Sequence, residues 1–173
     1  QLLLWLWPRG ARWLPHAYHR VVALILGLEV RAMGEALQAG PCLIVANHVS
    51  WIDIVALSAL APVSFIAKRE VAQWPFFGAL ARLQRTVFVG RERRHRAHGD
   101  KTEIERRLEA GDTLVLFPEG TSGDGASVLP FKSSLFGAAD AEHLPIQPVT
   151  LAYSHGWGLP LTRRCRPAFA WYG

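Results

Sequence analysis

Short runs rich in apolar and β-branched residues alternate along this chain with segments of helical pattern, and this alternation limits the fold more than any other feature. Each run has the length of a buried strand and is bounded by glycine, proline or polar residues. They predict strands at residues 42–46, 62–67, 85–89 and 112–117. Strands that alternate with helices build a sheet with helices on its faces. We therefore predict an α/β fold with a mixed, largely parallel sheet.

The connecting helices are predicted from apolar residues at helical spacing. They cover residues 51–60, a stretch that ends near residue 84, and residues 101–110. Ser50 is a suitable N-cap for the first helix, and Gly111 stops the third.

His48 and Asp53 lie where the first strand gives way to the first helix. Loops at the carboxyl ends of strands are where α/β folds hold ligands, and a histidine beside a carboxylate can act as a general base. An ordinary structural interpretation is also open at this stage. Ser50 and Asp53 fit a capping box, in which Asp53 only stabilises the helix start and His48 is a plain loop residue.

A second polar loop, residues 118–125, follows the fourth predicted strand. Its glycines could bring backbone N–H groups close to an anion, or they could simply form turns. Neither a Walker A pattern nor GxGxxG is present. Arg91 follows the third strand, so polar residues from three strand ends could meet at one edge of the sheet.

Composition points to a folded domain with a basic, membrane-compatible surface. The chain has 173 residues, half of them hydrophobic, and a net charge of +5. Of 19 Lys and Arg residues only three are Lys, and Arg suits phosphate groups. Together with seven Trp this favours an anionic membrane surface over nucleic acid, for which no binding motif appears. The distant Cys42 and Cys165 predict no disulfide and a reducing, cytoplasmic setting.

The first part of the chain is predicted to lie on the membrane. Residues 1–7 are hydrophobic but far short of the ~20 residues that a spanning helix needs. Residues 12–31 mix Trp, Tyr, His and Arg with an apolar run, as an interfacial helix does. The alternative is a terminal helix packed on the domain. We predict a membrane-associated segment at residues 1–34 and a second domain at 35–173, truncated at both ends.

Four sequence blocks, taken together, resemble a known family. They are Asn47-His48 with Asp53, Val87-Phe-Val-Gly-Arg91, Phe117-Pro-Glu-Gly-Thr121, and Leu144-Pro-Ile-Gln-Pro-Val149. In this order they look like the motif blocks of the glycerolipid acyltransferases, above all the 1-acylglycerol-3-phosphate acyltransferases. The resemblance covers roughly residues 40 to 150, and four ordered blocks are much more specific than one.

The resemblance implies a role for each matching residue. His48 would be the general base on a lysolipid hydroxyl, and Asp53 would orient its imidazole. The freed oxygen would attack the thioester of acyl-CoA or acyl carrier protein directly, without an acyl-enzyme, metal or bound cofactor. The substrate-binding residues would be Asn47, Arg91, Glu119, Gly120 and Thr121. The block at residues 145–148 would help to shape the acyl-thioester side.

Two departures from the family pattern concern phosphate recognition. Ser122 stands where many members have Arg, and Arg85 stands where Gly is frequent. Arg85 and Lys132 could each replace the lost cation. The resemblance implies an enzyme of phospholipid synthesis, at the cytoplasmic face of a membrane, that acylates 1-acylglycerol-3-phosphate. Another lysolipid such as lyso-ornithine lipid, or a non-catalytic membrane-binding module, is the alternative, and the intact His48 and Asp53 argue against the module.

Overall fold

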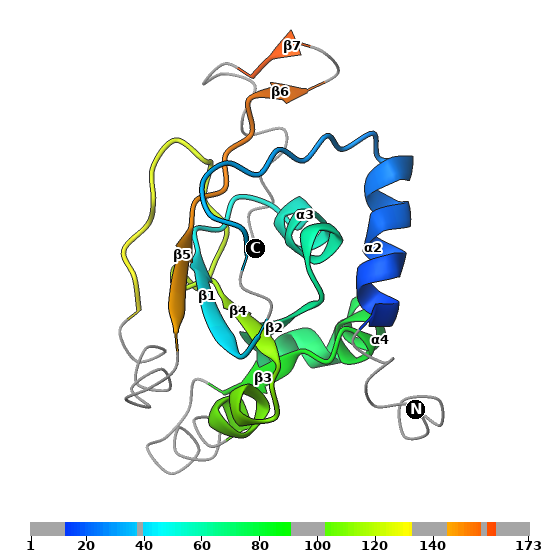
Figure 1. The fold of residues 1–173 in the computed structure, drawn as a ribbon, viewed down its shortest axis with the longest axis vertical. Helices are drawn as coiled ribbons and strands as arrows, with labels where there is room; N and C mark the ends of the chain where they lie inside the picture. The colour runs from blue at the N-terminus through cyan, green and yellow to red at the C-terminus, as the bar shows by residue number, and fades with distance from the viewer. Residues whose placement is uncertain (1–12, 38–39, 91–102, 133–144, 157–158, 162–173) are drawn as a thin grey trace.

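A five-stranded parallel sheet forms the centre of the protein (Figure 1). The computed structural model describes residues 13–37, 40–90, 103–132, 145–156 and 159–161. The strand order is β3-β2-β4-β1-β5, and every neighbouring pair is parallel. The strands are β1 (Cys42–Ala46), β2 (Val63–Lys68), β3 (Val87–Val89), β4 (Thr113–Leu116) and β5 (Ile146–Val149). The predicted α/β fold is thus confirmed.

Alternate residues of the central strands build two separate cores, one on each face of the sheet. Leu43 and Leu114 point to a cluster that includes Ile104 and Leu108 of the helical residues 103–109. Their neighbours along the two strands point the other way, toward Leu57 of helix α3 (Ile52–Leu60). Helices therefore cover both faces, which explains why β1 is buried along its whole length.

Several elements differ from their predicted form. A 3₁₀ helix, η2 (Arg69–Gln73), precedes α4 (Phe77–Leu83), where only a turn is predicted. Residues 146–149, for which no secondary structure is predicted, form a fifth strand. A small antiparallel pair, β6 (His155–Gly156) and β7 (Leu159–Pro160), follows it. Residues 1–12, 91–102 and 162–173 lie outside the described residues, so the predictions made for them stay predictions.

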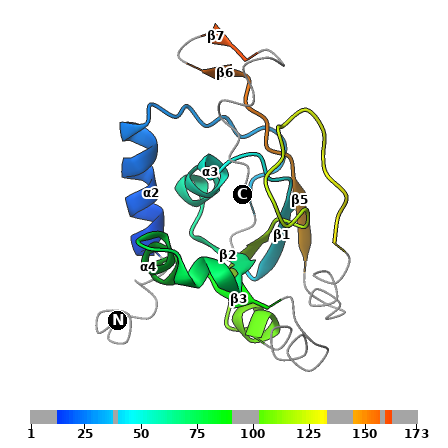
Figure 2. The ribbon, with the colours of Figure 1, turned by 180° about the vertical axis from the view of Figure 1, so that it is seen from behind.

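Helix α2 (Trp13–Ile25) lies beside α3 on one side of the molecule (Figures 1 and 2). It ends well before residue 31, because Gly27 adopts a positive φ of 64° and Leu28 N–H donates back to Ala23 O. Polar contacts join it to α3, where the His16 Nδ1 lies 2.7 Å from Ser58 O. No described helix is long and apolar enough to cross a bilayer.

The side of α2 that faces away from the protein is apolar. Its exposed residues at helical spacing are Leu14, Tyr18, Val21 and Ile25, and Ile25 is 77% exposed. The buried residues of the helix are the smaller Pro15 and Ala23. The larger hydrophobic side chains of α2 are thus not used in packing against the domain.

A buried ion pair ties the helix of residues 103–109 to the amino end of β4. The Arg107 guanidinium donates to the Asp112 carboxylate, to Arg85 O at 2.9 Å and to Ser64 Oγ at 3.2 Å. Arg85 Nη2 donates to the same carboxylate at 3.0 Å. One acidic side chain therefore holds two guanidinium groups where three segments meet.

Replacing Asp112 by Ala should lower the free energy of unfolding by about 3–5 kcal/mol, because Arg107 would be left buried without its counter-charge. The matched control is Glu103→Ala, which breaks an exposed pair with Arg106 and should cost about 1 kcal/mol or less. Urea denaturation of both variants measures the difference. Equal losses would contradict a structural role for the buried pair.

Candidate active site

The strand order brings three loops together at the carboxyl edge of the sheet. β1 lies between β4 and β5, so the segments that follow these strands are neighbours in space. His48 comes after β1, Glu119 after β4 and Tyr153 after β5. Backbone contacts join the first two loops, since Gly123 N–H donates to His48 O at 2.8 Å.

His48 and Asp53 form a hydrogen-bonded pair at this edge. The His48 Nδ1 lies 2.8 Å from Asp53 Oδ2. The imidazole is 20% exposed, whereas the carboxylate is fully buried. A carboxylate can only accept, so Nδ1 carries a proton, and in the neutral form of the ring Nε2 keeps a lone pair. Nε2 has no hydrogen-bond partner among the described residues, and it is therefore the atom that can accept a proton from a substrate.

Asp53 also holds the backbone of the His48 loop. Its Oδ2 accepts the N–H groups of Val49 at 2.7 Å and Ser50 at 3.0 Å. The bond from Ser50 is the one that a capping box would place here. The predicted N-cap at Ser50 is wrong, because α3 begins at Ile52 with Trp51 as its N-cap and has no side-chain capping bond. Asp53 nevertheless holds the backbone before α3 and orients His48.

The ring of His48 stacks on Phe117, which follows β4. The ring centroids are 4.1 Å apart and the ring planes differ by 15°. Phe117 in turn stacks on Phe65 of β2 at 6.1 Å. The imidazole is therefore fixed on one flat face by the core and at Nδ1 by Asp53, which leaves little freedom for the ring to turn.

Glu119 is buried and supports the same loop from the β4 side. Its Oε1 accepts His48 N–H at 2.8 Å, and its Oε2 accepts Leu129 N–H at 2.9 Å. The resemblance makes Glu119 a substrate-binding residue, and that role stays a prediction. In the structure each of its oxygens receives a backbone donor. Glu119 thus holds His48 in place and closes residues 119–129 into a compact loop.

Asn47 clips the segment after β5 to the end of β1. Its Nδ2 donates to Leu151 O at 3.0 Å, and its Oδ1 accepts Leu151 N–H at 2.7 Å. Both ends of the amide are therefore occupied by backbone. This side chain sets the path of the chain toward Tyr153 rather than facing open solvent.

Gly120, Thr121 and Lys132 lie next to this loop. Gly120 has a positive φ of 67°, and a side chain there would meet the Lys132 Nζ at 2.8 Å. Lys132 N–H donates to Pro118 O at 2.9 Å, which holds the lysine beside the loop. Lys132 thus lies beside this loop, and its phosphate-binding role stays a prediction. Thr121 is half-buried in the same turn.

Two other residues do not join this group. Arg85 precedes β3 and binds Asp112, so it lies at the amino edge of the sheet and is not a candidate for a phosphate site near His48. Arg91 lies outside the described residues, and its predicted role stays a prediction.

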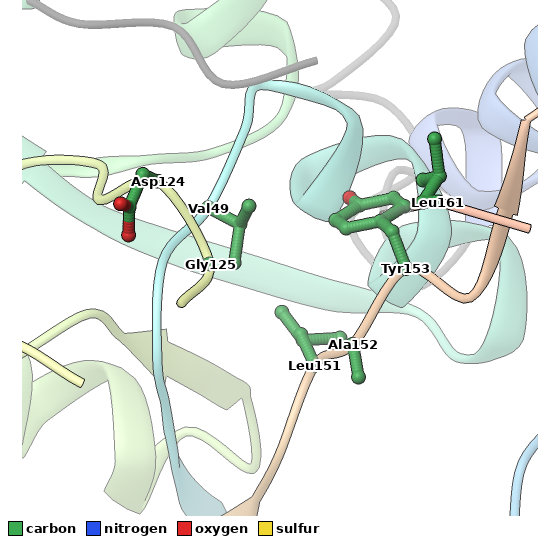
Figure 3. Close-up of a pocket in the computed structure, with 7 residues that line it drawn as sticks. All are labelled: Val49, Asp124, Gly125, Leu151, Ala152, Tyr153 and Leu161. Carbon is green, nitrogen blue, oxygen red and sulfur yellow. The ribbon is translucent and has the colours of Figure 1, made fainter. Parts of the chain in front are cut away.

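Tyr153 is the residue at this site that the sequence interpretation misses. Its hydroxyl donates to Asp53 Oδ1. Burial is the main cause that raises the pKa of Tyr153, and the negative charge of Asp53 is the second. The phenol therefore keeps its proton. Tyr153 lines a pocket of about 40 Å³ together with Val49, Leu151, Gly125 and others (Figure 3). Local sequence gives no signal for this contact, because it depends on the pairing of β5 with β1.

Other chemistries find little support among the described side chains. Burial raises the pKa of the Cys42 thiol, which lies within β1, and so disfavours a thiolate nucleophile. No cluster of three or more His, Cys, Asp or Glu suited to a metal ion occurs in the described part of the chain.

Replacing Glu119 by Ala should lower the free energy of unfolding by about 2–4 kcal/mol, because two half-buried N–H groups would lose a charged acceptor. The amide protons of His48 and Leu129 should exchange faster with solvent. Asp124→Ala is the control, since it removes an exposed carboxylate bond to Ala126 N–H and should leave the His48 amide unchanged. Hydrogen exchange by NMR compares them, and unchanged exchange at His48 in Glu119→Ala would contradict the assigned contact.

Comparison with known proteins gives one consistent family. The acyltransferase family model matches residues 28–152. A lyso-ornithine lipid O-acyltransferase of Brucella abortus is 49% identical, over 94% of this chain and 63% of its own. A 1-acyl-sn-glycerol-3-phosphate acyltransferase of Neisseria gonorrhoeae is 37% identical, over 87% of this chain and 57% of its own. The chain thus spans about 60% of the length of these relatives.

The fold has a counterpart among solved structures. The crystal structure of the 1-acyl-sn-glycerophosphate acyltransferase from Thermotoga maritima matches with a TM-score of 0.61 and 27% identity. The match covers 76% of this chain and 54% of that one. Motif blocks, sheet topology and these similarities agree, and the chain belongs to the acyltransferase family of glycerolipid and lysolipid enzymes.

Proposed function

We propose that the protein transfers a fatty acyl group from an acyl thioester to the free hydroxyl of lyso-ornithine lipid. The observation that supports the chemistry best is the His48–Asp53 pair, with Nδ1 held at 2.8 Å and Nε2 free of partners among the described residues. The acceptor is inferred from relatives with 49% and 48% identity that carry this name. These relatives favour lyso-ornithine lipid over 1-acylglycerol-3-phosphate, the other acceptor that the sequence leaves open.

The reaction needs one base and no covalent intermediate on the enzyme. Nε2 of His48 takes the proton of the lysolipid hydroxyl as its oxygen attacks the thioester carbonyl. The new C–O bond forms and the C–S bond breaks. The imidazolium, paired with the Asp53 carboxylate, then returns the proton to the leaving thiolate. Acyl-CoA or acyl carrier protein serves as the donor, and we propose no metal or bound cofactor.

Lysophosphatidate is the second candidate acceptor. The Neisseria relative and the Thermotoga structure carry the name of enzymes that use 1-acylglycerol-3-phosphate. Lys132, beside Gly120, could pair with a phosphate or a carboxylate. However, Ser122 replaces a frequent arginine and Arg85 is bound to Asp112 at the far edge. Among the described residues these two changes leave fewer cations near His48, which suits a head group with less negative charge than a phosphate monoester.

Purified protein supplied with acyl thioester should acylate lyso-ornithine lipid faster than lysophosphatidate, as measured by mass spectrometry of the products. His48→Ala should lower turnover by about 100- to 10,000-fold, because it removes the general base. His155→Ala is the control, since that exposed histidine on β6 should be dispensable. Faster acylation of lysophosphatidate would make it the acceptor, and full turnover by a folded His48→Ala protein would refute the mechanism.

The acceptor lipid requires contact with a membrane, and we propose that α2 lies on the cytoplasmic surface of one. Leu14, Tyr18, Val21 and Ile25 form an apolar stripe that nothing in the described structure covers. An amphipathic helix of this kind binds in the interface, with its apolar face among the lipids. A second set of exposed aromatic residues, Trp74, Phe76 and Phe77, surrounds the start of α4.

Charge on the α2 stripe should release the protein from membranes. The double variant Val21→Glu/Ile25→Glu should reduce co-sedimentation with anionic vesicles by at least ~100-fold in partition coefficient, because each apolar side chain contributes about 1.5–3 kcal/mol. Ile146→Glu, on the exposed edge strand β5, is the control and should bind normally. Circular dichroism checks the fold. Unchanged binding of the double variant would show that the membrane contact lies elsewhere.

A further inference from the structure

The two oxygens of Asp53 face different parts of the protein. Oδ2 receives His48 and two backbone N–H groups, from the loop between β1 and α3. Oδ1 receives the hydroxyl of Tyr153, which lies 100 residues farther along the chain. The carboxylate is fully buried, so no solvent donor can replace either set. The rotation of this carboxyl group is therefore set jointly by its own loop and by Tyr153.

Tyr153 is itself held in a defined place. The Asn47 amide bonds both backbone groups of Leu151, two residues before it. Asn47 is the residue directly before His48, so the same short loop that carries the base also fixes the segment that carries the tyrosine. In Figure 3 the phenol ring extends from that segment toward the start of α3. Tyr153, Asp53 and His48 thus form one chain of contacts across three segments.

We propose that Tyr153 is a positioning residue of the catalytic pair, which acts by holding Asp53 Oδ1 so that Oδ2 stays directed at His48 Nδ1. This inference rests on the proposed acyl transfer by His48. Without the hydroxyl, Oδ1 would be buried without this donor, and the carboxyl group would gain freedom to turn away from the imidazole. The imidazole would then be presented less often with Nε2 toward the acceptor hydroxyl. Tyr153 need not touch either substrate.

A role through Asp53 predicts a particular kinetic pattern. Tyr153→Phe removes one oxygen and keeps the ring that lines the pocket. It should lower kcat by about 10- to 100-fold, the effect of losing one hydrogen bond to a charged group. KM for the lysolipid and the acyl thioester should stay within about threefold, since only the base is displaced. A substrate-binding role would instead raise KM.

The control is Thr113→Val, which removes another largely buried hydroxyl, one that bonds Gly40 O at the amino edge of the sheet. This variant should keep kcat even if it loses stability. A double-mutant cycle adds Tyr153→Phe to Asp53→Ala. In that background the tyrosine change should cost less than about twofold, because the group through which it acts is gone. Independent, multiplicative losses would overturn the inference.

A spectroscopic measurement tests the contact without turnover. The His48 Nδ1–H resonance, assigned by its absence in His48→Ala, should shift in Tyr153→Phe and stay in place in Thr113→Val. If the wild type acylates neither lysolipid, the proposed function fails and this resonance still decides the role of Tyr153. An unchanged resonance, or a Tyr153→Phe enzyme with full kcat, would refute it.

Discussion

The buried carboxylate of Asp53 is the group on which the site depends. An ionised carboxylate that is withdrawn from water costs several kcal/mol unless hydrogen bonds compensate it. No Lys or Arg pairs with this carboxylate in the described structure. Four hydrogen-bond donors stabilise it instead: two backbone N–H groups, His48 and Tyr153. Each donor must stay in place for the carboxylate to remain stable. The shape of the loop, the orientation of the base and the path after β5 are thus coupled through one side chain.

The sheet separates this chemistry from the contacts that stabilise the fold. Placing β4 between β1 and β2 brings the His48 and Glu119 loops together at the carboxyl edge. At the amino edge Asp112 binds Arg85 and Arg107. Both edges contain buried charge. At the carboxyl edge the imidazole of His48 is 20% exposed, and its Nε2 has no hydrogen-bond partner among the described residues, so this atom is accessible to a substrate.

Local sequence pattern was sufficient for β1 to β4 and for the position of His48, because each depends on residues close together in the chain, but it did not predict β5, β6 or β7. It failed where a distant partner decides the outcome. Arg85 stands at a family position and looks like a phosphate ligand, yet Asp112, 27 residues away, takes its guanidinium. Tyr153 carries no motif, and only the pairing of β5 with β1 brings it to Asp53. The motif identified Glu119, but it did not predict that the carboxylate accepts hydrogen bonds from the backbone N–H groups of His48 and Leu129.

The membrane contact proposed for α2 would be linked to the His48–Asp53 pair through α3. Ser58 of α3 contacts His16 and His19 of α2, and its hydroxyl also accepts Gln84 Nε2 from the end of α4. These polar contacts, with small buried residues such as Ala23, are enough to seat α2, so its larger apolar side chains are free to face lipid. Asp53 lies in the first turn of the same α3. A lipid layer held by α2 would therefore have a fixed position relative to Asp53 and His48, and an acceptor could present its hydroxyl while its acyl chain stays in the membrane.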